Sequence, residues 1–206
     1  MRRFAHILSY LFHPLLMLTY GVTLALTCTF LTIYPLKMKG IIIGGTFLST
    51  AIFPAVFISL LVWSGAAKDI ELSRQRDRTL PYLIFIICVL SCAFFLHKML
   101  MPVWILAMLF GTCVALVVAL CVNFFWKISA HSIGIGGLTG GIMGTAKILL
   151  INPYWAFIVV ILIAGALCAA RIYLKRHTPM QVYTGFCLGF ICTFVASSMS
   201  YIYLFI

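Results

Sequence analysis

Long hydrophobic segments alternate with short polar ones along the whole chain. The hydrophobic segments cover approximately residues 7–33, 41–64, 82–97, 102–124, 133–150, 153–170 and 182–206. A helix that crosses a bilayer needs about 17–25 predominantly apolar residues, and most of these segments reach that length. Because 82–97 and 133–150 are shorter, we expect them to be tilted, kinked or partly buried in protein. The pattern predicts an all-α, polytopic transmembrane bundle of six or seven helices in a single domain, residues 1–206.

The first hydrophobic segment starts close to the N-terminus, after Arg2 and Arg3. A basic start before an apolar run also occurs in secretory signal peptides. This run continues to about Ile33 without a convincing small-residue cleavage site, so we predict that it is the first membrane span. Its two histidines, His6 and His13, are expected to lie at the interface and to pack within the span, and neither is assigned a role.

Composition supports a lipid environment. Of the 206 residues 65% are hydrophobic and only 8% are charged, whereas soluble domains carry roughly 25% charged residues. The continuous apolar runs differ from the short alternating segments of a β-barrel. The eight cysteines lie inside apolar segments, where we expect free, buried thiols that pack like small hydrophobic side chains. We therefore expect neither a metal nor another cofactor.

Net charge narrows the choice of partner. The formal charge of +11 comes from 14 Lys and Arg against 3 acidic residues. Basic residues commonly flank membrane spans, and an anionic substrate or lipid headgroup would also attract them. They form no continuous stripe, so nucleic acid is not an expected partner.

Three polar loops, at 65–81, 127–132 and 171–181, carry the residues with candidate chemistry. Two hydrophobic segments separate the first loop from the second, and two more separate the second from the third. If every segment crosses the bilayer, the three loops and the N-terminus face the same side. Polar groups far apart in sequence are therefore expected to form one site at one end of the bundle.

The basic residues on the two sides bear on orientation. Four lie on the side opposite the loops, and ten lie on the side of the loops, namely Arg2, Arg3, Lys68, Arg74, Arg76, Arg78, Lys127, Arg171, Lys175 and Arg176. The positive-inside rule would then place the loops toward the cytoplasm. Four of the ten are expected to belong to the site rather than to set the orientation, namely Arg74, Arg78, Lys127 and Arg171. Without them the ratio falls to six against four, so sidedness stays open.

The first loop contains alternating arginines, Arg74, Arg76 and Arg78, with Lys68 upstream and Pro81 downstream. Arginine forks bind phosphate oxygens through paired hydrogen bonds. The alternative is a solvated basic loop that pairs with its own acidic residues.

The second loop contains His131 between two serines. Ser129 or Ser132 is placed to cap the following helix, and an anion at that N-terminus would meet free backbone N–H groups. The alternative for His131 is a structural histidine at the membrane interface. Later glycines have the spacing of closely packed membrane helices, and we expect packing there rather than ligand contact; they are Gly136, Gly140 and Gly144.

The third loop contains Arg171 and, six residues later, His177. On one continuous helix these side chains would point about 240° apart, so a shared site requires a turn. Thr178 and Pro179 predict a new helix with Thr178 as N-cap and Pro179 at the first position, and Gln181 completes a capping box. The positive end of that helix disfavours imidazolium, so we expect a neutral His177 that can attack phosphorus.

Together these elements resemble the type-2 phosphatidic acid phosphatase superfamily, in particular its short, very hydrophobic members in Bacteroidetes-type bacteria. The resemblance rests on basic residues leading to Arg-x-x-Pro, on Ser-x-His, and on Arg-x5-His followed by Gly185-x3-Gly189. It covers about 68–189. It implies a phosphatidic-acid-phosphatase-like helical core, a multi-pass protein of the bacterial inner membrane, and metal-independent hydrolysis of a lipid phosphate monoester or polyprenyl diphosphate.

The resemblance also implies residue roles. His177 would be the nucleophile that forms a phosphohistidine, and His131 would donate a proton to the leaving group. The phosphoryl oxygens would be held by basic and hydroxyl side chains of the three loops: Arg171, Arg78, Arg74, Lys68 and Ser129. Positive charge around the equatorial oxygens is what stabilises a phosphoryl-transfer transition state.

Gln181 departs from the family pattern, which has an Asp four residues after the nucleophilic histidine. A Gln carbonyl can accept the imidazole N–H and orient the ring, but it adds no negative charge. In a serine-protease triad the change from Asp to Asn costs ~10⁴ in turnover, mainly because the histidine takes the wrong tautomer. We therefore expect either a reduced activity or a substitute acid from the first loop, Asp69, Glu71 or Asp77. The other departures are Ile-Ser-Ala-His in place of Pro-Ser-Gly-His and the displacement of Pro81 from Arg78.

Two other functions therefore remain open. One is a catalytically impaired membrane protein that binds lipid phosphates without hydrolysing them, which Gln181 favours. The other is a small transporter or flippase, which should have ionisable residues along a path through the spans. Apart from Lys147 and histidines at span ends, the hydrophobic segments contain almost none.

Overall fold

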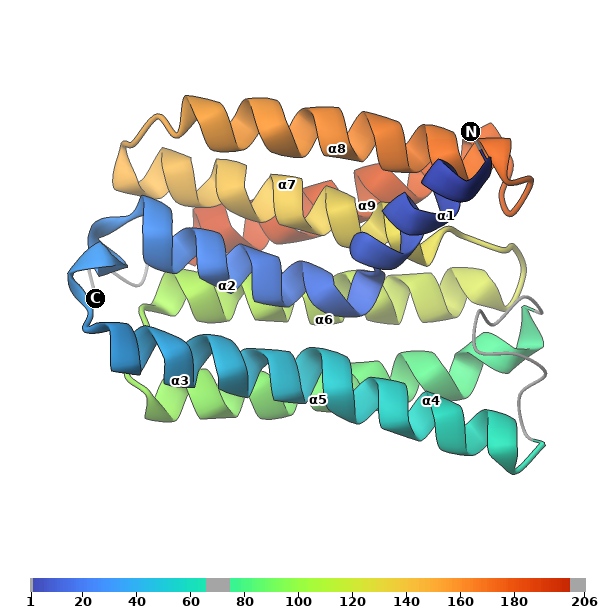
Figure 1. Cartoon of the computed structure of the whole chain (residues 1–206), viewed down its shortest axis with the longest axis horizontal. Coiled ribbons are helices and arrows are strands. Elements are labelled where there is room, and N and C mark those ends of the chain that lie inside the picture. Colours follow the sequence, from blue (N-terminus) through green and yellow to red (C-terminus); the bar gives the residue numbers. More distant parts are fainter. Residues whose placement is uncertain (1, 66–74, 201–206) are drawn as a thin grey trace.

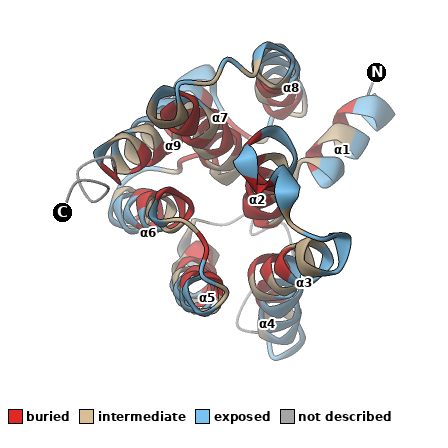
Figure 2. Cartoon of the chain, turned by 90° about the vertical axis from the view of Figure 1, so that its left-hand side faces the viewer, coloured by how far each residue is buried: buried red, intermediate tan, exposed pale blue. Residues whose placement is uncertain are grey.

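The computed structural model describes residues 2–65 and 75–200. They form helices whose axes are roughly parallel, apart from the oblique first helix (Figure 1). The α-helices are α1 (Arg2–Leu11), α2 (Met17–Cys28), α3 (Leu36–Phe47), α4 (Phe53–Trp63), α5 (Thr79–Lys98), α6 (Val103–Asn123), α7 (Ala130–Leu149), α8 (Tyr154–Tyr173) and α9 (Pro179–Met199). Short 3₁₀ segments lie at Pro14–Leu16, Phe30–Ile33 and Arg76–Arg78, and a π-helical segment lies at Leu48–Ile52. Viewed from the end, the helices turn their buried faces inward and their exposed faces outward (Figure 2).

Six helical segments within the described residues are long and apolar enough to cross a membrane. They are Arg2–Cys28, Leu36–Trp63, Thr79–Lys98, Val103–Asn123, Tyr154–Tyr173 and Pro179–Met199. The glycine-rich α7 has 20 residues as well but is less apolar, and it lies beside α2, α8 and α9 with more than half of its residues buried. This confirms an all-helical, multi-pass membrane architecture.

The predicted first membrane span is confirmed as Arg2–Cys28, but its helix is interrupted at Pro14–Leu16. His13 has the extended backbone (φ −66°, ψ 141°) that a residue before proline favours. Its ring Nδ1 accepts a hydrogen bond from the Leu15 N–H at 3.4 Å, which starts the 3₁₀ turn. Pro14 has no N–H to continue α1, so α1 ends at Leu11 and tilts away to pack on α8 (Figure 1).

The two segments expected to be short are full-length helices. α5 and α7 have 20 residues each, because both helices begin several residues before the hydrophobic stretch does. Thr79 opens α5, and Ala130-His131-Ser132 forms the first turn of α7. Polar first turns extend these helices toward the loops.

Glycines bring α7 and α9 into backbone contact. A Cβ added at Gly136, Gly140 or Gly189 would collide with a carbonyl oxygen of the facing helix, and one at Gly144 would lie 2.6 Å from the Ser197 Cβ. The Thr193 hydroxyl donates a hydrogen bond across the pair to the Gly137 carbonyl at 2.9 Å. The expected close packing of these glycines is confirmed, and α7 and α9 form a tightly joined pair.

The described residues of the three candidate loops, 65 and 75–78 of the first, 127–132 and 171–181, lie at the same end of the bundle, together with the start of α1 (Figure 1). The C-terminal ends of α4, α6 and α8 lie there, and the links after α2, α5 and α7 lie at the opposite end. The count of hydrophobic segments therefore predicted correctly which helix ends lie together.

Candidate functional site

A cavity of about 320 Å³ lies within the bundle and reaches the end that carries the three loops. Its polar lining includes residues from all of them: Arg78, His131, Arg171, Arg176 and His177. Arg78, Arg171 and His177 are each less than 9% exposed. The structure thus brings four of the predicted site residues, Arg78, His131, Arg171 and His177, to a single cavity.

The turn between α8 and α9 places Arg171 and His177 on the same cavity. The Lys175 N–H donates to the Ile172 carbonyl and the Arg176 N–H donates to the Arg171 carbonyl, at 2.9 and 3.2 Å. This is a Schellman motif, with Lys175 in the left-handed position (φ 55°) where glycine is usual. α9 then begins at Pro179, with the predicted Thr178 N-cap. The predicted reversal of the chain is confirmed.

Gln181 determines which nitrogen of His177 carries the proton. Its side-chain Oε1 accepts the backbone N–H of Thr178 at 3.2 Å, which completes the predicted capping box. A backbone N–H can only donate, so the amide atom facing it is the oxygen. The same oxygen lies 3.0 Å from His177 Nδ1, which must therefore be the protonated nitrogen. The lone pair of the neutral ring is on Nε2.

His177 is neutral over the physiological pH range. Burial, followed by the positive charge of Arg78, lowers its pKa from the usual 6.5 to about 3, and Lys127 and Arg171 act in the same direction. The hydrogen bond to Gln181 opposes this shift. The neutral state agrees with the sequence-based expectation, but its main cause is burial rather than the helix dipole.

Hydrogen bonds to backbone carbonyls connect the described parts of the three loops through residues 127–129. The Arg78 guanidinium donates to the Ile128 carbonyl at 2.8 Å. The Ser129 N–H donates to the Gln181 carbonyl at 3.3 Å, and the Lys127 ammonium donates to the Arg176 carbonyl at 3.4 Å. The middle loop therefore links the arginine of the first loop to the histidine-bearing turn of the third.

Ser129 does not line the cavity. Its side chain is fully buried, and its Oγ caps α7 by accepting the Ser132 N–H at 3.4 Å and the Ser132 hydroxyl at 2.9 Å. The expectation that Ser129 or Ser132 caps this helix is confirmed for Ser129. Lys68 and Arg74, also expected to bind phosphate, lie outside the described residues.

The first segment contributes to the site, which the sequence-based prediction missed. His131 donates its Nε2–H to the Ser9 carbonyl of α1 at 3.2 Å, which leaves the lone pair of its neutral ring on Nδ1. The rings of His13 and His131 meet edge to face with centroids 5.4 Å apart. Because His13 Nδ1 accepts from Leu15, its proton is on Nε2.

A signal for this contribution is present in the sequence. Four polar or aromatic residues that line the cavity, His6, Ser9, Tyr10 and His13, recur at positions i, i+3, i+4 and i+7. This spacing places side chains on one face of a helix. A polar face within an otherwise apolar segment indicates a protein-facing or cavity-facing surface.

One thiol lies next to the site: Cys168 donates to the Ser132 hydroxyl at 3.9 Å. All eight cysteines are free, as expected. Cys28, Cys121 and Cys187 are exposed on the outside of the bundle, so the expectation that all of them are buried is wrong for these three.

Comparison of the chain with models of protein families, with curated proteins and with solved structures finds no match in any of the three. The fold and the site define a class of protein: an integral, multi-pass helical membrane protein. Its cavity at one end is lined by histidine and arginine side chains. What it does is therefore argued from this cavity.

Proposed function

We propose that this protein is a metal-independent membrane phosphatase that hydrolyses a lipid phosphate monoester or a polyprenyl diphosphate through a phosphohistidine intermediate. The observation that carries the proposal is the state of His177. It is neutral, oriented by Gln181 through Nδ1, and lines the same cavity as His131 and two buried arginines. A nucleophilic imidazole needs these properties: a lone pair, a held ring, and positive charge where the phosphoryl oxygens will lie.

In the first chemical step Nε2 of His177 attacks phosphorus. The new N–P bond forms as the P–O bond to the lipid breaks, and a protonated His131 transfers its Nδ1 proton to the departing oxygen. Arg78 and Arg171 stabilise the charge on the equatorial phosphoryl oxygens. Binding of the anionic phosphate favours the protonated state of His131, because an adjacent negative charge stabilises imidazolium.

In the second step water replaces the histidine. His131, now neutral, accepts a proton from water as the oxygen attacks phosphorus. The N–P bond breaks, inorganic phosphate leaves, and His177 returns to the neutral state that Gln181 orients.

The test is phosphate release by the purified protein in lipid nanodiscs, with EDTA present, from phosphatidic acid, phosphatidylglycerophosphate and undecaprenyl diphosphate. We expect release from at least one of them and a loss of at least about 10³-fold in His177→Ala. His97→Ala is the matched control, because His97 is exposed at the opposite end of the bundle. Retained turnover in His177→Ala would falsify the proposal.

A second candidate is a lipid-phosphate-binding membrane protein without hydrolysis. It is favoured by the amide at Gln181, which holds the imidazole without the negative charge that would stabilise it during reaction. Lipid phosphate binding by the folded wild type without phosphate release would support this candidate, particularly if Gln181→Asp then gained turnover.

A further inference from the structure

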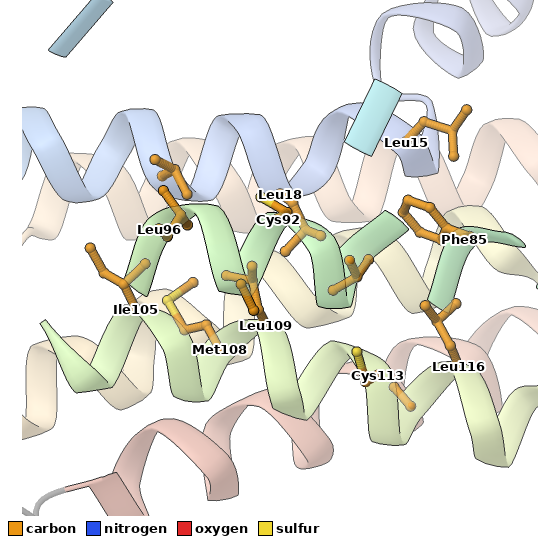
Figure 3. Packing of buried hydrophobic residues seen from close by; sticks show 14 of the residues in the cluster. Leu15, Leu18, Phe85, Cys92, Leu96, Ile105, Met108, Leu109, Cys113 and Leu116 are labelled. Carbon is orange, nitrogen blue, oxygen red and sulfur yellow. The ribbon is translucent and has the colours of Figure 1, made fainter. Parts of the chain in front are cut away.

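The cavity continues from the histidines into the apolar interior of the bundle. Beyond the polar end its walls come from α2, α5, α6 and α7, with Leu18, Phe85, Leu116 and Leu138 among the lining residues. His131 and Leu138 both line it and are seven residues apart on α7, so it extends roughly 10 Å along that helix. Figure 3 follows the surrounding core from Phe85 and Leu116 to Met108.

Met108 of α6 closes the inner end of this cavity. Its methyl carbon lies between two glycines: a Cβ added at Gly21 of α2 would be 3.5 Å from it, and one at Gly141 of α7 would collide with it. The Thr145 hydroxyl donates to the Met108 sulfur at 3.7 Å. A methionine held between two glycines fills the space between three helices with one flexible side chain.

A second, smaller cavity of about 30 Å³ lies on the other side of Met108. Met108 and Gly21 line both cavities, and the remaining walls of the smaller one include Leu24, Ile142 and Thr145. One side chain thus separates two apolar spaces that follow each other along the bundle.

We propose that the inner part of the larger cavity binds a single hydrocarbon chain of the substrate and that Met108 determines how long a chain fits. The assignment rests on the proposed function for the anionic headgroup, which places phosphate beside Arg78 and Arg171. The chain then extends from the phosphate between apolar walls. This differs from a tail that stays wholly in the bilayer while only the headgroup enters the protein.

The cavity volume and the energetics of tail transfer favour binding of one hydrocarbon chain rather than two. A volume of about 320 Å³ is at the small end of ligand sites, which span roughly 300–1,000 Å³, so a second tail must remain outside. A lipid tail gains no hydrophobic energy by leaving lipid for an apolar protein interior. It does gain dispersion contacts with the apolar walls of the cavity, and the bound headgroup holds it there.

The test locates the end of the chain directly. Alkylphosphonates with a terminal diazirine, in decyl and tetradecyl lengths, are photolysed with the full-length protein in nanodiscs, and the labelled residues are identified by mass spectrometry. We expect the decyl probe to label residues around Met108 and Leu138. In Met108→Ala the tetradecyl probe should gain at least about fivefold in labelling of Leu24 and Ile142, the walls of the second cavity.

Two control variants distinguish a change in the position of the bound chain from misfolding of the protein. Met143→Ala removes a methionine on the exposed side of α7 and should leave the labelling pattern unchanged. Met108→Val, a smaller change, should show the same direction of shift if the alanine variant is poorly folded. Labelling confined to outward residues of α6, such as Phe110 and Val114, would overturn the proposal.

Failure of this site and failure of the phosphatase proposal give different results. Interior labelling without phosphate release leaves the hydrocarbon-chain site standing and rejects hydrolysis. Phosphate release that depends on His177, with labelling only on lipid-facing residues, keeps the phosphatase and rejects the chain site.

Discussion

The two sides of the cavity are built in different ways. On one side, α7 and α9 are joined by backbone contacts at glycines, and the turn before α9 is held by a Schellman motif and a capping box. On the other side, α1 packs on α8. It is connected to the site by the hydrogen bond from His131 to the Ser9 carbonyl. His177 and Arg171, on which the proposed reaction depends, lie on the first side.

The difference between the α7–α9 side and the α1 side indicates which part of the site is preorganised. His177 and Arg171 are held by local motifs in which each hydrogen bond spans only a few residues. His13 and Ser9 reach the cavity only because α1 breaks from α2 and tilts. We infer that the α7–α9 side sets the chemistry and that the α1 side tunes it.

The largest expected contrast is between the two neighbouring histidines. His131→Ala removes the proposed proton donor and should lower phosphate release by about 10²–10⁴-fold. His13→Ala removes a ring that lies against His131 but has no proposed role in proton transfer, and it should cost about tenfold. Single-turnover phosphate release would measure both. Equal losses would contradict the division of the cavity into a reactive and a tuning side.

A carboxylate at position 181 should change the ionisation of His177. In Gln181→Asp, a negative charge near Nδ1 favours imidazolium, so we expect the pKa of His177 to rise from about 3 by about 1–3 units. Imidazole chemical shifts of ¹⁵N-histidine-labelled protein would follow this pKa. A pKa that did not move would show that Gln181 does not contact the ring in solution.

Stability against acid should follow the same pKa. The folded protein keeps His177 neutral down to about pH 3, whereas the unfolded chain binds the proton near the usual pKa of 6.5. Stability is therefore lost as pH falls below 6.5, by up to about 1.4 kcal/mol per unit. Thermal unfolding between about pH 7 and about pH 4.5 should show less loss in Gln181→Asp and His177→Ala than in the wild type.

The close contact between α7 and α9 can be tested by comparing alanine substitutions at two glycines. Gly189→Ala forces a methyl group against the Ile133 carbonyl and should destabilise the fold by about 1–3 kcal/mol. Gly165→Ala on α8 is the control, because an added Cβ there meets nothing within 4 Å. Thermal unfolding in detergent compares the two. A loss from Gly165→Ala as large as that from Gly189→Ala would contradict the close contact.

The smallest effect concerns the turn that carries His177. Lys175 has a left-handed backbone (φ 55°) that glycine adopts without strain. Lys175→Gly should therefore stabilise the protein by about 0.5–1 kcal/mol, with phosphate release unchanged. A rise in the midpoint of thermal unfolding would be the measure. A decrease would indicate that the lysine side chain contributes more than the backbone strain costs.

Much of the architecture could be predicted because each signal is local. The apolar runs require helices in lipid, the number of runs between loops decides which loops meet, and Thr178 with Gln181 predicts the start of α9. Pro14 and the polar face at His6, Ser9, Tyr10 and His13 were equally visible, but their meaning depends on where α1 packs.

The sequence by itself determined the helical class, which helix ends lie together and the turn that presents His177. Hydropathy and capping act within a few turns of helix, and the number of spans between two loops follows from hydropathy. Only the tertiary structure decided the rest. Ser9 and His13 lie beside His131. The Ser129 side chain caps α7 and does not line the cavity. Met108 lies between Gly21 and Gly141. These outcomes depend on how helices distant in sequence pack, and no local pattern specifies which side chain fills the space between three of them.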